Sequence, residues 1–435
     1  MVDSKKIGRT WFILAHCFNM DGRAASQTIT DKLPFIMEKG IQPVVLSAPT
    51  GDRDDRFPHF QILSPAPSGV LFELRHIIKK RFPNRFKEKG LKALLTVFCL
   101  PFLVVEKIFI QLDSQWSWFV SATFKGRRLI RRFNPELIYS TAGPPSTHAA
   151  GYFLHKITGI PWLAEVHDPL IQNNERPRWH NYFFKRWIEQ KIWENASAVI
   201  YFTEKARQSA GGRNRGKGNP FVLRPGALAP DLTGVRYEKR PAIHFGHFGS
   251  LAEDRNLAVV IRAMHDLIEK KPEWREFLEL DIYGADLDPV SRKFLRQYPL
   301  KGVVSLHGRL EYDPETGKSG RQQVLEAMCK SDVLLLIHGA DEAVGEYIPS
   351  KLYEYLLVKR PVIGLVSAGS ELEAFLRSTG HRTADQADLA AVKRVIANSI
   401  EKWFTSGLKN PESETVYTVD KTVRELINIV DGFCQ

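Results

Sequence analysis

The chain has 435 residues, of which 43% are hydrophobic and 25% charged, values that are ordinary for a globular protein and exclude a disordered or collagen-like chain. This length is too great for one ordinary core and predicts two domains of roughly 200 residues each. The net charge of +12 is uneven, because residues 1–240 hold 37 Lys and Arg against 20 Asp and Glu, whereas residues 241–435 hold 24 against 29. The basic excess therefore indicates a partner of the first half and not a general nucleic-acid coat.

Cysteine usage and the first residues narrow the class of protein further. The four cysteines lie far apart, with no C-x-x-C pair and no histidine at zinc spacing, so we expect no metal and a reducing compartment. The apolar run after Lys5, Lys6 and Arg9 is short, and no small-residue cleavage site follows it. We therefore interpret it as a first buried strand and not as a signal peptide.

The first half of the chain alternates short apolar runs with helix-length amphipathic stretches, which is typical of a parallel α/β sheet. The predicted strands are residues 11–17, 44–46, 137–139, 162–166, 199–202 and 221–223. Helices are predicted between several of them, for example over residues 147–158 and 179–194. This alternation predicts an N-terminal Rossmann-like domain over residues 1–225.

Residues 70–132 interrupt the alternation as a basic and apolar insertion. Residues 75–92 contain eight basic residues against one acid, and the apolar run of residues 93–105 follows. That run is too short to span a bilayer, which needs about 20 residues. A basic segment beside a short apolar stretch is typical of a segment that lies on an anionic membrane surface, with Trp116, Trp118 and Phe119 as interfacial aromatics. The alternative is a core helix with a solvated basic flank.

The second half repeats the α/β pattern. Its predicted strands are residues 243–248, 280–283, 303–306, 333–337 and 362–366, and its helices include residues 257–270 and 320–330. Residues 226–241, with two prolines and two glycines, are the best candidate for a linker. We therefore predict a C-terminal Rossmann-like domain over residues 242–410. Residues 411–435 are predicted to end in a helix that packs back on the first domain.

Two stretches at the ends of predicted strands carry polar residues suited to a ligand site. His167 follows a predicted strand, and the carboxyl ends of parallel strands line the ligand crevice of an open sheet, although a lone histidine is often structural. Gly249 and Ser250 end another strand, where a glycine lets the backbone approach a phosphate, and Arg255 offers a forked guanidinium. A simple strand-to-helix turn is the alternative interpretation of this second stretch.

A third stretch, residues 333–366, reads as a buried strand, an acidic loop, a helix and the next strand. Ser350 occupies a candidate N-cap position, and the N-terminus of a helix attracts phosphate. Glu354, one turn inside the helix, is not easily buried without a partner, and ribose hydroxyls are natural partners for it. Glu346, on the preceding loop, is suited to accept hydrogen bonds from sugar hydroxyls. Helix glutamates are common on surfaces, so their spacing alone carries little weight.

The spacing Glu346-x7-Glu354, with Pro361 seven residues later, resembles the E-x7-E signature of retaining GT-B glycosyltransferases of glycosyltransferase family 4, in the branch with the motif PSKLYEYL. Three further stretches are similar to that branch: GHFGSLAEDRN, TAGPPSTHAAGYFLHKITGIPWLAEVHDP and GRLEY. The resemblance covers residues 134–203 and 243–365 well and residues 49–130 poorly. Two positions differ from the family pattern, since Asp21-Gly22-Arg23 stands where paired glycines are common and Lys359 stands where a glycine precedes the proline.

The resemblance implies a fold of two Rossmann-like domains facing across a cleft, and it assigns roles to individual residues. Glu346 would contact the donor sugar, and His167 would face the reaction centre from the other domain. The nucleotide diphosphate would be bound by Gly249, Ser250, Arg255, Ser350 and Lys351 on the phosphate side, by Glu354 at the ribose, and by Arg309 and Leu310 at the base. Gly22 would lie in the first loop, on the acceptor side.

The sequence therefore predicts an enzyme that moves a sugar from a nucleotide diphosphate sugar to an acceptor, without a permanent cofactor or a metal. The basic first domain favours a lipid-linked or anionic glycan acceptor and an anionic membrane surface, on the cytoplasmic face of the cell membrane, as in bacterial surface polysaccharide or lipopolysaccharide synthesis. Nucleic acid is not expected as a partner, because the basic residues do not interleave with stacking aromatics. The alternatives are a nucleotide-sugar epimerase of the same fold and a non-catalytic membrane-bound module that only binds the donor.

Overall fold

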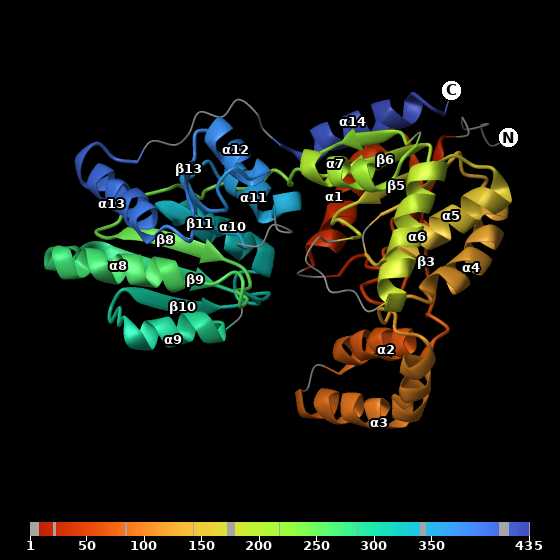
Figure 1. Ribbon diagram of the computed structural model, residues 1–435, viewed down its shortest axis with the longest axis horizontal. Helices are drawn as coiled ribbons and strands as arrows, with labels where there is room; N and C mark the ends of the chain where they lie inside the picture. The colour runs from red at the N-terminus through yellow and green to blue at the C-terminus, as the bar shows by residue number, and fades with distance from the viewer. Residues whose placement is uncertain are drawn as a thin grey trace. The chain divides into compact units, whose positions relative to one another are not determined.

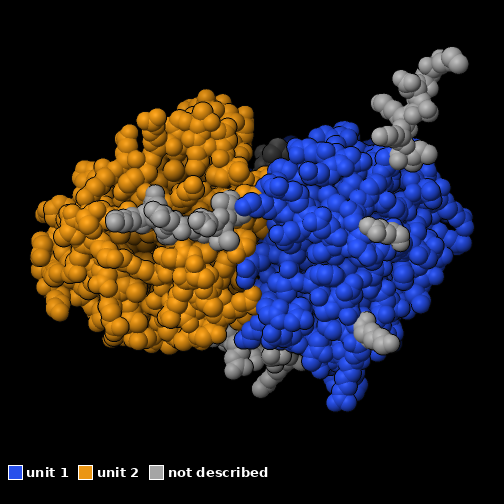
Figure 2. All heavy atoms as spheres, turned by 90° about the horizontal axis from the view of Figure 1, so that it is seen from above, with its two compact units in different colours: residues 1–225, 419–435 blue, residues 226–418 orange. Residues whose placement is uncertain are grey.

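The computed structural model describes residues 8–20, 23–82, 85–141, 143–171, 179–216, 218–284, 286–339, 345–408 and 417–434. The chain forms two compact units, drawn in different colours in Figure 2. Unit 1 comprises Met1–Pro225 and Val419–Gln435, and unit 2 comprises Gly226–Thr418. Each unit is an α/β layer structure around one parallel sheet, which confirms the predicted fold class of two Rossmann-like domains.

The sheet of unit 1 has seven parallel strands in the order β3-β2-β1-β4-β5-β6-β7. Their bounds are β1 Thr10–Leu14, β2 Gln42–Ser47, β3 His59–Gln61, β4 Leu137–Ser140, β5 Trp162–Val166, β6 Ala198–Tyr201 and β7 Pro220–Val222. The inner strands β1, β4, β5 and β6 are buried at every residue except the first of β1, Thr10, as expected for a parallel sheet covered on both faces.

Six helices cover the two faces of this sheet (Figure 1). Their bounds are α1 Ala24–Glu38, α4 Trp118–Phe133, α5 Pro145–Thr158, α6 Trp179–Asn195, α7 Glu204–Arg213 and α14 Val419–Asp431. Helices α4, α5 and α6 pack side by side on one face, where Trp118, Ala150 and Ile188 join the core formed by Phe12 and Val199. Helix α1 lies on the opposite face and contacts α14.

The basic segment forms a pair of helices, α2 (Pro67–Arg81) and α3 (Arg85–Phe109), that project from unit 1 (Figure 1). The predicted insertion extends too far, because α4 belongs to the core and not to the projecting pair. The prediction of Trp118 as an interfacial aromatic is wrong: its side chain is fully buried. Phe119 is partly buried and stacks on Phe153, with ring centroids 5.5 Å apart. The sequence pattern predicted a membrane role for these aromatics because basic residues flank them. In the structure they belong to the regular crossover helix α4.

The sheet of unit 2 has six parallel strands in the order β10-β9-β8-β11-β12-β13. Their bounds are β8 Ile243–Phe248, β9 Leu278–Tyr283, β10 Val304–Gly308, β11 Val333–Ile337, β12 Val362–Leu365 and β13 Arg382–Ala384. The helices of this unit are α8 Ala258–Lys270, η1 Pro272–Phe277, α9 Pro289–Gln297, α10 Gly320–Lys330, α11 Lys351–Leu357, α12 Glu371–Ser378 and α13 Leu389–Thr405. Helices α8 and α13 cover one face, and α10, α11 and α12 cover the other.

Candidate functional site

The first candidate site lies in unit 2, where the strand order reverses between β8 and β11. Such a reversal in a parallel sheet leaves a crevice at the carboxyl ends of the strands, and ligands bind there. Gly249 follows β8 directly, and the segment after β11 leads to Glu346 and then to Lys351 at the start of α11. The topology therefore brings these three residues to one edge of the sheet, the one formed by the carboxyl ends of its strands.

Gly249 and Lys351 are in close contact at this edge. Gly249 has a φ angle of +115°, which side-chain-bearing residues rarely adopt, and a Cβ atom at this position would lie 1.9 Å from Lys351 Nζ. The backbone N–H of Gly249 donates to the carbonyl of Tyr283 over 2.7 Å, which fixes the loop against β9. Both the backbone conformation and the ammonium group packed on its Cα therefore require glycine here.

Positive charge is concentrated beside Gly249. Burial lowers the pKa of Lys351 to about 8, with Arg255 acting in the same direction and the carboxylate of Glu354 opposing both. His247, which is buried beneath the loop, has a pKa lowered to about 3 by burial and then by the charges of Lys351 and Arg255. An anion bound at this edge would relieve the repulsion between the two cations, so the loop has the electrostatic character of an anion site.

The two glutamates of the E-x7-E spacing have different environments. Glu354 lies on α11, and its Oε1 accepts hydrogen bonds from Arg321 Nε at 3.2 Å and from Nη2 at 3.1 Å. Both of these contacts use Oε1. Glu346 is only 1% exposed, on the segment before α11. Ser350 is the N-cap residue of α11, as predicted, but its side chain makes no capping hydrogen bond.

The residues predicted to contact a base lie after β10. Arg309 is exposed, and Leu310 lines a cavity of about 330 Å³ together with Tyr283. Tyr283 stacks on Phe248 at 4.6 Å and on His307 at 4.1 Å, so three aromatic rings form a row across the ends of β8, β9 and β10. Ser250, which is exposed, follows the first strand of this row.

The second candidate site is a cavity of about 300 Å³ in unit 1. It lies where the strand order reverses between β1 and β4, and its lining includes Cys17 after β1 and His167 after β5. Arg23, His148 and Asp113 also line it. Burial lowers the pKa of His148 to about 3, so this histidine is neutral. Gly22, the predicted acceptor-side residue, lies outside the described residues, next to Arg23.

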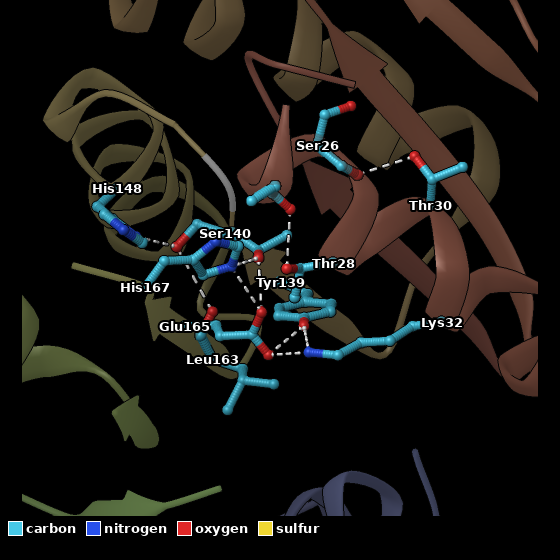
Figure 3. Close-up of polar contacts among 12 residues, drawn as sticks. Ser26, Thr28, Thr30, Lys32, Tyr139, Ser140, His148, Leu163, Glu165 and His167 are labelled. Atoms are coloured by element: carbon cyan, nitrogen blue, oxygen red, sulfur yellow. Dashed lines mark hydrogen bonds and ion pairs between the residues drawn. The ribbon is translucent and has the colours of Figure 1, made fainter. Parts of the chain in front are cut away.

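A buried polar network holds His167 at the edge of this cavity (Figure 3). His167 Nε2 lies 2.9 Å from Glu165 Oε1 and 2.9 Å from Thr141 Oγ1, and the imidazole stacks on Phe202 at 4.7 Å. The fully buried Glu165 also forms an ion pair with the fully buried Lys32 of α1. The lysine charge and the hydrogen bonds keep the pKa of Glu165 well below its usual range despite burial.

The residues that support the two sites could not be recognised as such from local sequence patterns. Arg321 bonds to Glu354, and Lys32, Glu165 and Thr141 hold His167. One signal was available: Glu165 is the only charged residue in the apolar run 162–166, and an ionisable side chain inside a buried strand needs a partner. The partner, Lys32, is 133 residues away in sequence, and local patterns carry no information on such a pairing.

The described part of the chain lacks two other features. None of its helices is long and apolar enough to cross a membrane. It also contains no group of three or more His, Cys, Asp or Glu side chains that could hold a metal ion.

Comparisons with known proteins agree with this architecture. Residues 96–226 match the family model of a glycosyl transferase 4-like domain. The search of curated proteins finds no match. Among solved structures, Anabaena HepE in complex with UDP and glucose superimposes with a TM-score of 0.60 at 13% identity, covering 98% of this chain and 100% of that one.

Two further structures share the fold. A sucrose-phosphate synthase from Thermosynechococcus elongatus has a TM-score of 0.57 at 13% identity, with 98% of this chain and 95% of that one covered. A putative UDP-N-acetylglucosamine 2-epimerase from Listeria monocytogenes has a TM-score of 0.53 at 10% identity, with 98% and 96% covered. The chain therefore has a GT-B-type fold, and its residues 96–226 are similar to a glycosyltransferase domain. Together these findings support a protein of the glycosyltransferase type.

Proposed function

We propose that the chain is a glycosyltransferase that moves a sugar from a nucleotide diphosphate sugar to an acceptor. The observation that carries this proposal is the packing of Lys351 against Gly249 beside Arg255, at the point where the strand order of unit 2 reverses. A diphosphate would bring negative charge to these two cations, and the glycine lets it approach the backbone. Anabaena HepE, which has the same fold, is bound to UDP in its solved structure, and this supports the same ligand class here.

The other predicted residues complete the donor site in this proposal. Glu354 Oε2 accepts hydrogen bonds from the ribose hydroxyls while Arg321 holds Oε1. Glu346 contacts the sugar, and Ser250 the diphosphate. Arg309 and Leu310 contact the base. Because Lys351 and Arg255 meet the charge that develops on the departing diphosphate, the reaction needs no protein nucleophile, in keeping with the retaining mechanism that the family resemblance implies.

The acceptor is proposed to bind in unit 1, in the cavity lined by His167. The connection between α3 and α4 contributes Asp113 and Gln115 to this cavity. The same connection contacts α6, where Asn181 Nδ2 donates to Asp113 Oδ1 over 3.2 Å. The cavity therefore adjoins the helical pair α2–α3, and an acceptor anchored in a membrane under α3 would have its head group near the cavity.

Helix α3 has the surface chemistry of a membrane-binding element. Its apolar side chains at helical spacing are exposed and not buried: Leu94, Val97, Phe98, Val105 and Ile108. The opposite side of the helix packs on α2, where Glu106 accepts a hydrogen bond from Ser68 N at 2.8 Å, and on the α3–α4 connection, where Glu106 accepts one from Trp116 Nε1 at 2.8 Å. An outward apolar stripe with lysines at its N-terminal end favours an anionic membrane over the alternative of a core helix. We therefore propose that the protein acts on a lipid-linked glycan at the inner face of the cell membrane.

A thermal-shift screen of nucleoside diphosphates and their sugars tests the donor site. A ligand at 100 times its Kd stabilises a protein by about 2.7 kcal/mol, which raises the Tm of a domain of this size by about 5–10 °C. We expect one base to give such a shift and Glu354→Gln to reduce it. The absence of a shift with any nucleoside diphosphate or its sugar would contradict the proposal.

Epimerase activity is the second candidate, because the putative Listeria epimerase shares the fold. An epimerase needs no acceptor and no membrane-facing helix, so the exposed stripe of α3 argues against it. Incubation with UDP-N-acetylglucosamine alone, followed by product analysis, separates the two: an epimer without an added acceptor supports the epimerase. If the chain is a non-catalytic module, neither the wild type nor Glu346→Ala will hydrolyse the donor, and both will still bind the nucleotide.

A further inference from the structure

The atoms around His167 Nε2 determine which ring nitrogen carries the proton. Glu165 Oε1, Thr141 Oγ1 and His167 Nε2 lie within 2.8–2.9 Å of one another. An ionised carboxylate only accepts hydrogen bonds, and the single hydroxyl proton of Thr141 is donated to Glu165 Oε1. Two oxygen lone pairs therefore face Nε2, and only an N–H at Nε2 makes both contacts favourable.

In a neutral imidazole, a proton on Nε2 leaves Nδ1 as the hydrogen-bond acceptor. Among the described residues, no hydrogen bond partner of Nδ1 is found, and His167 lines the cavity of unit 1. Phe202 stacks on the ring and restricts its rotation. An acceptor nitrogen at the wall of a cavity is suited to receive a hydrogen bond from a hydroxyl group.

The carboxylate that sets this tautomer is itself held in place. Lys32 Nζ pairs with Glu165 Oε2, and Tyr139 donates its hydroxyl to the same oxygen over 2.7 Å. All three side chains are fully buried. A buried ion pair of this kind contributes little to net stability, so a role in positioning is a better explanation of its presence.

We propose that Glu165 and Lys32 are positioning residues that fix His167 in the Nε2–H tautomer, so that Nδ1 accepts a hydrogen bond from a hydroxyl of a saccharide acceptor in the cavity. The inference rests on the proposed acceptor role of this cavity. The tautomer itself is a property of the free protein, so its test is independent of glycosyl transfer.

The test uses ¹⁵N-histidine-labelled full-length protein and long-range ¹H–¹⁵N correlation spectra, with His167→Gln to assign the signals. At pH 7.5 we expect the wild type to show the Nε2–H tautomer alone at His167. The opposite tautomer in the wild type would overturn the proposal, whatever any variant does.

Two variants distinguish a role of Glu165 and Lys32 in fixing the His167 tautomer from a purely structural role. Lys32→Met combined with Glu165→Gln removes both charges at nearly constant volume, so no single charge stays buried. We expect this double variant to show a mixture of tautomers. Thr141→Val is the matched control, because it removes a contact with the same nitrogen but keeps the carboxylate, and it should retain the Nε2–H form. Retention of the wild-type signature in the double variant would overturn the positioning role.

Unchanged UDP-induced thermal shifts in the double variant would show that unit 2 is intact. Where transfer to a saccharide acceptor is detected, the double variant should lower kcat about tenfold or more, with the KM for the donor unchanged. An equal kcat in the double variant and the wild type would overturn the link between tautomer and acceptor. Failure of transfer in every variant would contradict the proposed function but not the tautomer.

Discussion

Gly249 is the residue whose replacement tests the donor site most directly. Gly249→Ala puts a Cβ atom 1.9 Å from Lys351 Nζ, so the ammonium group must move away from the proposed diphosphate. We expect affinity for UDP, measured by calorimetry, to fall at least tenfold, or about 1.4 kcal/mol. Gly302→Ala is the matched control, because Gly302 has a φ angle of +75° and a Cβ atom added there would meet no other atom within 4 Å. That variant should cost about 1–2 kcal/mol of stability without changing affinity.

Lys351 should make UDP binding depend on pH. Its pKa is lowered to about 8, so the ammonium form dominates at pH 7 and is lost as the pH rises to 9. The second phosphate ionisation, near pH 6, leaves the ligand charge constant in this window. We expect affinity to fall about tenfold from pH 7 to 9, since hydrogen bonds to charged groups contribute about 1.5–3 kcal/mol. Lys351→Met should bind weakly with no pH dependence here, and an identical pH profile for both proteins would exclude Lys351 as the titrating group.

The individual residues differ in how far the sequence could identify them. Gly249, Lys351 and Glu354 lie in stretches with a family resemblance, and the structure brings them to one edge of a sheet. The pairing of Lys32 with Glu165 could not be predicted, because Lys32 occupies a core position of α1 between Ile29 and Leu33 and its partner is far away in sequence. Lys359 adopts a φ angle of +52°, in the left-handed region that favours glycine, at the position where the sequence differs from the family that it resembles.

At the scale of elements, α3 carries the clearest testable feature. Phe98→Glu combined with Val105→Glu places two charges in its exposed apolar stripe. Full burial of one such side chain is worth about 1.5–3 kcal/mol, so we expect sedimentation with phosphatidylglycerol-containing vesicles to fall at least tenfold. Phe124→Glu on α4 is the matched control, because Phe124 is 71% exposed and Phe98 is 72% exposed.

The control variant should sediment like the wild type. Wild-type protein that stays in the supernatant with anionic vesicles would contradict the membrane role. Dimers that form without vesicles and dissociate in the double variant would instead identify the stripe as an interface between two copies.

Strands with an apolar run could be predicted from the sequence, whereas edge strands without such a run and the orientation of helix faces could not. The predicted ranges of β5, β8 and β11 agree with the structure, because each is a nearly fully buried strand with large apolar side chains. Strands β3 and β13 were missed, since each has three residues at a sheet edge and no run to detect. The apolar periodicity of α3 is the same whether its apolar stripe faces a core or solvent. The sequence alone therefore does not show that this stripe is exposed.

At the scale of the whole molecule, UDP binding should depend on the residues of unit 2 alone. The proposed UDP-binding residues all lie in Gly226–Thr418, a continuous stretch with its own sheet and core. We expect this fragment, expressed alone, to fold and to bind UDP with an affinity within about threefold of the full chain, or about 0.65 kcal/mol. Calorimetric titration checks this. A folded fragment that does not bind UDP would mean that residues of the other unit are needed for binding.

Unit 1 is discontinuous, and this predicts a strong effect of the last helix. Residues Val419, Val423, Leu426 and Val430 of α14 are buried. Their removal, by ending the chain after Thr418, forfeits about 6–12 kcal/mol at 1.5–3 kcal/mol for each side chain, which is comparable with the total stability of a domain. We therefore expect the truncated protein to lose the folded state of unit 1, seen as rapid proteolysis within residues 1–225, while UDP still shifts the transition of unit 2. Asp431→Asn is the control: it removes only the partly exposed pair with Arg9 (2.7 Å), and such pairs contribute at most about 1 kcal/mol. A protease-resistant unit 1 in the truncated chain would show that α14 is dispensable for its fold.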